Sequence, residues 1–119
     1  MNKRNRGAFY EEAVKEYLIR QNIVVLYQNY YCHYGEIDLI AKDQDTAVFF
    51  EIKYRKDNKY GLPEEAVTKS KQRHICKCAE WFLMNHTWVK SIRYDVIAIE
   101  GKEIRWIRNA FEHIGYRAY

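Results

Sequence analysis

The sequence predicts an α/β protein with a mixed central sheet of about five strands, in the order α-β-β-β-α-β-β. Segments with apolar residues at helical spacing alternate with short β-branched and aromatic runs, and turn residues separate them. A length of 119 residues with 48% hydrophobic residues suits a single domain over residues 1–119. No stretch approaches the ~18 consecutive apolar residues of a membrane-spanning helix, so no membrane partner is expected.

Each expected element has its own local signal. A first helix is predicted over residues 7–21, and a long helix is predicted from Glu64 to about Met84, where a proline and two acidic residues mark its start. β-Branched and aromatic runs predict strands at residues 23–31, 36–42, 46–54, 92–99 and 103–107. The second and third strands are separated by a short Asp-rich turn, which predicts an antiparallel hairpin. A short helical turn is expected in the tail from Asn109.

Positive charge is concentrated in one part of the chain. The window from Lys53 to Lys77 holds eight Lys or Arg residues against three acids, a net charge of +5, whereas the whole chain carries +4. A polyanion such as nucleic acid is a natural partner for this window. A solvated helix face that serves only solubility remains an alternative.

The three cysteines predict free thiols. Cys32, Cys76 and Cys78 are odd in number, and no secretory signal pattern precedes them, so a reducing, cytoplasmic environment is expected. On a helix, His74 and Cys78 share a face but Cys76 does not. Helical thiols in or near the core are therefore favoured over a structural zinc site, which needs four suitably spaced ligands.

The predicted hairpin at residues 36–42 and 46–54 carries charges among apolar residues. Because side chains alternate along a strand, Asp38, Glu51 and Lys53 can share one face, and Glu36 can join them. Burying a charge without a partner is costly, so a lysine–carboxylate ion pair or a cation held by oxygen ligands must compensate. From the spacing alone, an ion pair on an edge hairpin is the favoured interpretation.

The chain is rich in tyrosine, with eleven in total. Four of them, Tyr27, Tyr30, Tyr31 and Tyr34, lie just before the predicted hairpin. Packing within a strand is favoured for this cluster, and stacking on unpaired nucleobases is the alternative.

Two blocks on the hairpin, Gly35–Ala41 (GEIDLIA) and Val48–Arg55 (VFFEIKYR), resemble the signature of the YraN-like family of small bacterial proteins. A later block, Arg93–Val96 (RYDV), and the Ala110–Phe111 pair resemble the corresponding late segments of that family. The similarity covers nearly the whole chain. It implies a restriction-endonuclease-like three-layer fold, the PD-(D/E)xK fold, related to Holliday-junction resolvases.

The resemblance implies phosphodiester hydrolysis at a pattern of one acid followed by acid-x-Lys. By this resemblance Asp38 and Glu51 bind Mg²⁺ or Mn²⁺, and the backbone carbonyl of Ile52 adds a ligand. Lys53 is expected to position the attacking water or to stabilise the transition state. Glu11 is expected to face the same site from the first helix.

The implied function is a metal-dependent endonuclease acting on branched or repair-intermediate DNA, and a homodimer is expected because the chain is small. The residues expected to contact DNA are Arg55, Lys69, Lys71, Gln72 and Arg73. Two alternatives stay open: a non-catalytic nucleic-acid-binding module with the same fold, and an interaction protein whose basic helix binds an acidic partner.

Overall fold

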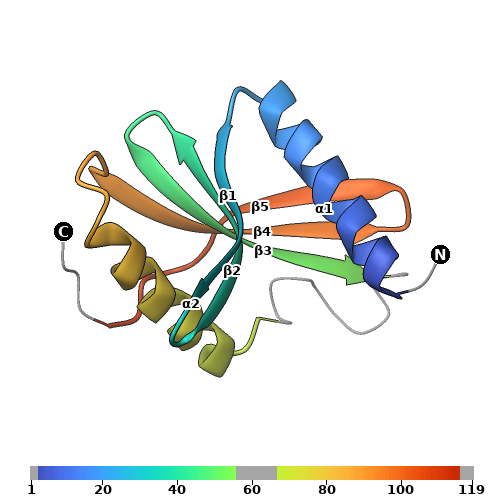
Figure 1. Ribbon diagram of the computed structural model, residues 1–119. Helices are drawn as coiled ribbons and strands as arrows, with labels where there is room; N and C mark the ends of the chain where they lie inside the picture. The colour runs from blue at the N-terminus through green and yellow to red at the C-terminus, as the bar shows by residue number, and fades with distance from the viewer. Residues whose placement is uncertain (1–2, 56–66, 116–119) are drawn as a thin grey trace.

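In a computed structural model of the protein, a five-stranded mixed sheet lies between two helices (Figure 1). The structure describes residues 3–55 and 67–115, with side chains at residues 9–54 and 67–115. In chain order the elements are α1 (Lys3–Arg20), β1 (Val24–Cys32), β2 (Gly35–Asp43), β3 (Thr46–Arg55), α2 (Lys69–Leu83), β4 (Ser91–Glu100) and β5 (Glu103–Phe111). The strands neighbour one another in chain order; β3 and β4 are parallel, and the other pairs are antiparallel. The predicted α/β class and element order are confirmed.

The two faces of the sheet form two separate apolar clusters, which gives the fold three layers. Phe50 of β3 lies in one cluster with Val14 of α1, and its neighbour Phe49 lies in the other cluster with Phe82 of α2. All four side chains are at most 1% exposed. Strand alternation explains this division, because adjacent residues of a strand face opposite sides of the sheet. None of the helices in the described part of the chain is both long and apolar enough to cross a bilayer.

Helix α2 begins at Lys69, later than the predicted start at Glu64. Glu64 itself lies outside the described residues, but Val67 and Thr68 are described and are not helical. Thr68 is the N-cap: its hydroxyl accepts a hydrogen bond from the backbone N–H of Lys71 at 3.2 Å. The cap satisfies a donor of the first turn and so sets the start of the helix.

Residues 109–111 continue strand β5 and residues 112–115 are not helical, so the predicted helical turn is wrong over the described part of the tail; residues 116–119 lie outside the described residues. Asn109 has a left-handed backbone with a φ of 54°, and its N–H donates to the carboxylate of Asp95 at 2.8 Å. The register between β4 and β5 shifts between Tyr94 and Val96, and pairing resumes between Tyr94 and Phe111. The chain bulges here without leaving the sheet.

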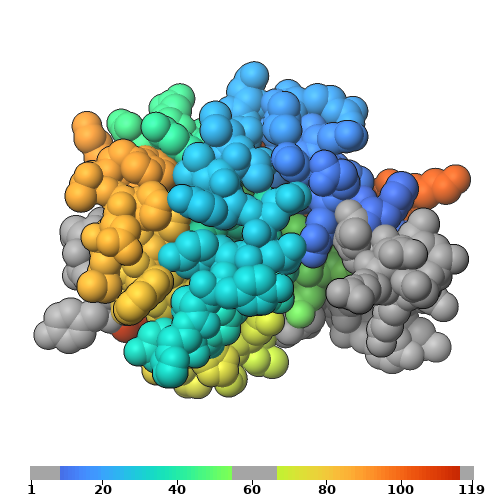
Figure 2. Space-filling model, viewed as in Figure 1, coloured from blue at the N-terminus to red at the C-terminus, as the bar shows by residue number. Residues whose placement is uncertain are grey.

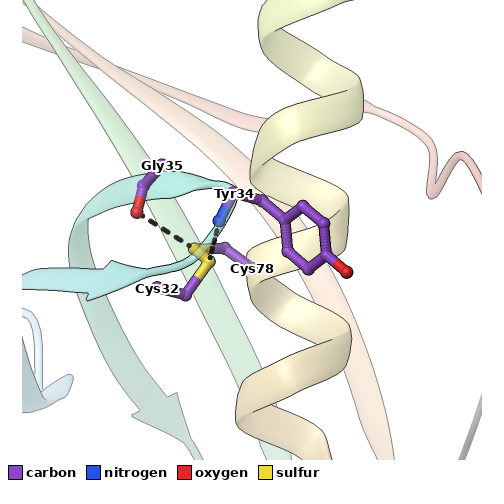
Figure 3. Close-up of a disulfide and its surroundings, with 4 residues drawn as sticks. All are labelled: Cys32, Tyr34, Gly35 and Cys78. Carbon is purple, nitrogen blue, oxygen red and sulfur yellow. Dashed lines mark hydrogen bonds between the residues drawn. A yellow bond between two sulfur atoms is a disulfide. The ribbon is translucent and has the colours of Figure 1, made fainter.

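A disulfide joins Cys32, at the end of β1, to Cys78 of α2, as Figure 3 shows. The prediction of free thiols is therefore wrong for these two residues, and Cys76 remains a buried free thiol. The two bonded cysteines are 46 residues apart, and the packing of α2 on the β1–β2 hairpin brings their Cα atoms to 5.8 Å. In the space-filling view, this hairpin crosses the centre of the face in cyan and teal, against the helix (Figure 2). Hairpin and helix are thus covalently tied.

Candidate functional site

The candidate site lies where strands β2 and β3 separate. Their antiparallel ladder runs from Asp43 and Thr46 to Leu39 and Phe50, which places Asp38 just past the last pair. In Figure 1 the β1–β2 hairpin then curves towards α2, while β3 continues towards α1. The backbone N–H of Ile52 donates to Oδ2 of Asp38 at 2.8 Å. The Asp38 carboxylate therefore takes the place of a backbone partner and sits in the opening between the strands.

Asp38 carries an unfavourable charge in this position. Burial, followed by the negative charges of Glu51 and Glu36, raises its pKa from 3.8 to about 7. The hydrogen bond from Ile52 and the positive charge of Lys71 act in the opposite direction and do not fully compensate. The influence of Glu51 means that the two carboxylates are close, as the alternation along β2 and β3 predicts.

Glu51 is almost completely buried, with 4% of its surface exposed. Its Oε1 lies 3.4 Å from Nζ of Lys53 and 3.6 Å from Nζ of Lys71. Its Oε2 is buried and has no hydrogen-bond partner among the described residues. Both lysines approach the same oxygen, so Glu51 keeps one uncompensated oxygen inside the site.

Two further acids border the opening. Glu36 of β2 is half-buried, and its Oε2 also lacks a hydrogen-bond partner among the described residues. Glu11 of α1 is half-buried and accepts a hydrogen bond from Nδ2 of Asn29 at 3.3 Å. The negative charge of Glu36, and to a smaller extent the charges of Glu11 and Asp38, raise the pKa of Tyr31. We call Glu11, Glu36, Asp38 and Glu51 the acid cluster.

The residues expected to contact DNA differ in how exposed they are. Lys69 and Arg73 are exposed on α2, and Lys71 reaches Glu51. Gln72 is buried, and its side-chain amide donates to the backbone carbonyl of Val67 at 2.9 Å, so it does not line an open surface. Arg55 ends β3, and its side chain lies outside the described part of the chain.

Sequence reasoning left Glu36 without a role and did not pair Lys71 with Glu51. The signal for Glu36 was its spacing of two residues from Asp38, which puts both on β2 near the same opening. Local sequence held no signal for the Lys71 contact. That contact depends on how α2 packs against the sheet.

The acid cluster suits a hard divalent cation. Within the described residues, no group of three or more Cys, His, Asp or Glu side chains lies so that it could hold a metal ion by itself. Mg²⁺, however, commonly uses only one or two carboxylates and completes its shell with water and substrate phosphate. Asp38, with its raised pKa, and Glu51, with an unpartnered buried oxygen, offer such a pair, and a cation would relieve their repulsion.

The chain matches the uncharacterised protein family UPF0102 over residues 10–99. It is 43% identical over 110 residues to a UPF0102 protein of Psychromonas ingrahamii, covering 91% of this chain and 90% of the relative. A UPF0102 protein of Lachnoclostridium phytofermentans is 40% identical over 117 residues, covering 97% of this chain and 99% of the relative. The chain belongs to the UPF0102 family.

Further UPF0102 relatives give the same result, among them a protein of Nitrosomonas europaea that is 36% identical over 111 residues, covering 91% of this chain and 94% of the relative. The resemblance to the YraN-like family is thereby confirmed. The matched UPF0102 span contains the whole acid cluster, with Lys53 and Lys71.

Proposed function

We propose that this UPF0102 protein is a metal-dependent endonuclease that hydrolyses phosphodiester bonds of branched or repair-intermediate DNA at the acid cluster. One observation carries the proposal: Asp38 and Glu51 adjoin where β2 and β3 separate. Oε2 of Glu51 is buried without a partner among the described residues, and the Nζ atoms of two lysines lie within 3.6 Å of its Oε1. Carboxylates and lysines in one partly buried opening supply the oxygen ligands and positive charges that phosphodiester hydrolysis uses.

The acids would supply oxygen ligands for the cation in this proposal. Asp38, Glu51 and the backbone carbonyl of Ile52 would hold Mg²⁺ or Mn²⁺, the ligand set that the family resemblance implies. The bound ion would lower the pKa of the attacking water and neutralise charge on the scissile phosphate. Glu11 and Glu36, half-buried at the edge of the opening, orient water by accepting hydrogen bonds.

The two lysines have separate tasks in the proposal. The Lys53 side chain is 30% exposed and reaches Glu51 from the same strand, so a modest rotation brings its ammonium to the phosphate oxygens that gain charge in the transition state. Lys71, 42% exposed on α2, holds a neighbouring phosphate, and Lys69 and Arg73 extend the basic surface along the helix.

The test is cleavage of labelled single-stranded, flap, four-way-junction and duplex DNA in Mg²⁺ or Mn²⁺. Asp38→Asn and Lys53→Ala are compared with wild type, and Asp45→Asn, at an exposed turn, is the matched control. We expect cleavage of at least one branched substrate. Each site variant should lower the rate at least about 100-fold, as loss of a charge-stabilising group does, whereas the control should retain the wild-type rate.

Absence of cleavage on every substrate with either metal would disprove the nuclease. Salt-dependent DNA binding without cleavage would favour the non-catalytic binding module, because phosphate contacts make affinity fall with salt. Absence of both would favour an acidic protein partner. The homodimer and the cytoplasmic location stay predictions.

A further inference from the structure

Tyr31 has the largest exposed fraction, 72%, of all the large hydrophobic side chains in the described part of the chain. It lies near the end of β1 and pairs across the ladder with Glu36 of β2, a member of the acid cluster. A single exposed aromatic residue needs no explanation on most surfaces. Here its position matters, because the open ring lies beside the proposed reaction site.

The hydroxyl of Tyr31 is held while its ring stays open. The charge of Glu36 and a hydrogen bond with the Glu36 side chain raise the pKa of Tyr31, followed by smaller effects of burial, Glu11 and Asp38. The Tyr31 side chain therefore lies near that of Glu36, its partner across the ladder. No aromatic ring or cation stacks on the Tyr31 ring among the described residues, and the side chain is 72% exposed.

The neighbouring tyrosines have different surroundings. Tyr27 and Tyr30 make edge contacts with the buried ring of Phe82, as expected for strand packing. The ring of Tyr34 has Nζ of Lys77 at 5.1 Å above it. Of the four tyrosines before the site, Tyr31 is thus the one whose ring has no aromatic or cationic partner within residues 9–54 and 67–115.

The end of β1 that carries Tyr31 is anchored on both sides. Tyr30 precedes it and packs on Phe82 of α2, and Cys32 follows it and is bonded to Cys78 of the same helix (Figure 3). A fixed backbone and a tethered hydroxyl leave little motion to be lost when another ring stacks on Tyr31. Such preorganisation favours binding because less conformational entropy is lost.

The order of the strands places the tyrosine, the acids and the lysine on three neighbouring strands. Tyr31 lies on β1, Glu36 and Asp38 lie on β2, and Glu51 and Lys53 lie on β3. Tyr31 pairs with Glu36 across the β1–β2 ladder, and Asp38 follows Glu36 by two residues on β2, so Tyr31 lies on the β1 side of the opening between β2 and β3. A phosphate at the lysines and the acid cluster therefore brings an adjacent base towards the Tyr31 ring.

We propose that Tyr31 is a stacking platform for an unpaired nucleobase next to the scissile phosphate, so that the site prefers single-stranded and flap DNA to continuous duplex. This inference rests on the proposed function of the acid cluster. In a duplex the bases already stack on one another, and only an unpaired base is free to cover the ring. Loss of one base–aromatic stack lowers affinity by about 5- to 150-fold.

The test measures binding of fluorescent oligonucleotides by anisotropy, separately from cleavage. A single-stranded oligonucleotide, a flap and a matched duplex are titrated with wild type, Tyr31→Ala, Tyr31→Phe and Tyr31→Trp. Trp81→Ala removes another half-exposed aromatic side chain, from α2, and is the control. Binding is measured in EDTA and again with Mg²⁺ in the Asp38→Asn background, so that no substrate is cut.

Tyr31→Ala should weaken binding of the single strand and the flap by about 5- to 150-fold and leave duplex binding unchanged. Tyr31→Phe and Tyr31→Trp should stay within about threefold of wild type, because both keep an aromatic face, and Trp81→Ala should behave as wild type. The platform would be disproved if Tyr31→Ala lost the same affinity for all three DNAs or lost none. It would also be disproved if Tyr31→Phe bound DNA as weakly as Tyr31→Ala.

The two proposals fail in different ways. If the protein cuts no DNA but Tyr31→Ala loses single-strand binding, the stacking platform is supported and the nuclease is disproved. If wild type and Tyr31→Ala cut DNA with the same preference for flap over duplex, the nuclease is supported and the platform is disproved. Absence of DNA binding in wild type overturns the platform as well.

Discussion

Two groups of buried acids in this protein have opposite surroundings. Asp95 of β4 has no exposed surface and accepts hydrogen bonds from Nε of Arg93, Nε1 of Trp106 and the backbone N–H of Asn109, all at 2.8–3.1 Å. Asp38 has one short backbone hydrogen bond and a raised pKa, and neighbouring Glu51 has an oxygen without a partner among the described residues.

The comparison separates a carboxylate with several donors from carboxylates with few. The donors around Asp95 come from β4 and β5 and hold the bulge between these strands, so its charge stabilises the fold. In the acid cluster, Asp38 accepts one backbone hydrogen bond, and one buried oxygen each of Glu36 and Glu51 has no partner among the described residues, so the charges of the cluster oppose the fold. Burial alone does not distinguish the two environments, but the number of donors does.

The largest expected effect is the difference in stability between two variants, Asp95→Asn and Asp38→Asn, which carry the same substitution in the two groups. Asp95→Asn places an amide N–H₂ against Arg93 and Trp106 and should lower the free energy of unfolding by about 3–5 kcal/mol, as breaking a buried ion pair does. Asp38→Asn should not lower it at neutral pH, because it removes a repelled charge. Urea denaturation at pH 7.5 in EDTA measures both. Equal losses for the two variants would break the comparison.

The raised pKa of Asp38 should also make the stability of the folded protein depend on pH. The pKa of Asp38 is about 7 in the folded state against 3.8 in the reference state, so between these values the folded protein binds more protons than the unfolded chain. Stability therefore falls as pH rises through this window. At 1.36 kcal/mol per unit the fall contributed by Asp38 is at most about 4 kcal/mol, and coupling to Glu51 reduces it.

The difference between wild type and Asp38→Asn isolates this contribution from those of all other groups in the protein. Urea midpoints from pH 4 to pH 8 in EDTA should converge near pH 4, and wild type should become the less stable of the two near pH 8. Parallel curves for the two proteins would mean that Asp38 titrates in the folded state as it does in the unfolded chain.

A divalent cation should offset the repulsion between the carboxylates of the acid cluster and should not act in this way at Asp95. At a Mg²⁺ concentration ten times its dissociation constant, binding to the folded state adds about 1.4 kcal/mol, which raises the melting temperature by roughly 3–6 °C. Asp38→Asn and Glu51→Gln should lose this shift, whereas NaCl of matched ionic strength should not produce it. A full shift in both variants would place the cation elsewhere.

Much of this fold was predictable because its signals are local. β-Branched and aromatic runs predicted all five strands, and alternation put Asp38, Glu51 and Lys53 together before any family was considered. The family resemblance added the expected roles. Glu11 was expected to face the site from the first helix; it lies on α1 and accepts a hydrogen bond from Asn29 of β1, and its role at the site stays a prediction.

What the sequence could not predict depends on how distant segments pack. The Cys32–Cys78 bond spans 46 residues, and the Lys71–Glu51 contact depends on the seating of α2 on the sheet. The partners of Asp95 come from a bulge whose left-handed residue, Asn109, resembled a helical turn in the sequence. The start of α2 was misplaced because a proline and two acids mimicked a first turn, whereas the cap at Thr68 determines it.

The smallest effect should come from a third environment, the exposed carboxylate of Asp45. Its side chain is 64% exposed and lies 3.9 Å from Nζ of Lys90, whose side chain is 79% exposed. Water solvates both charges, so Asp45→Asn should change stability by less than about 0.5 kcal/mol at any pH from 4 to 8. The same urea series measures it. If Asp45→Asn shifted stability as much as Asp38→Asn, the net charge of the protein would explain both changes. The crowding of Asp38 with Glu51 would then have no special role.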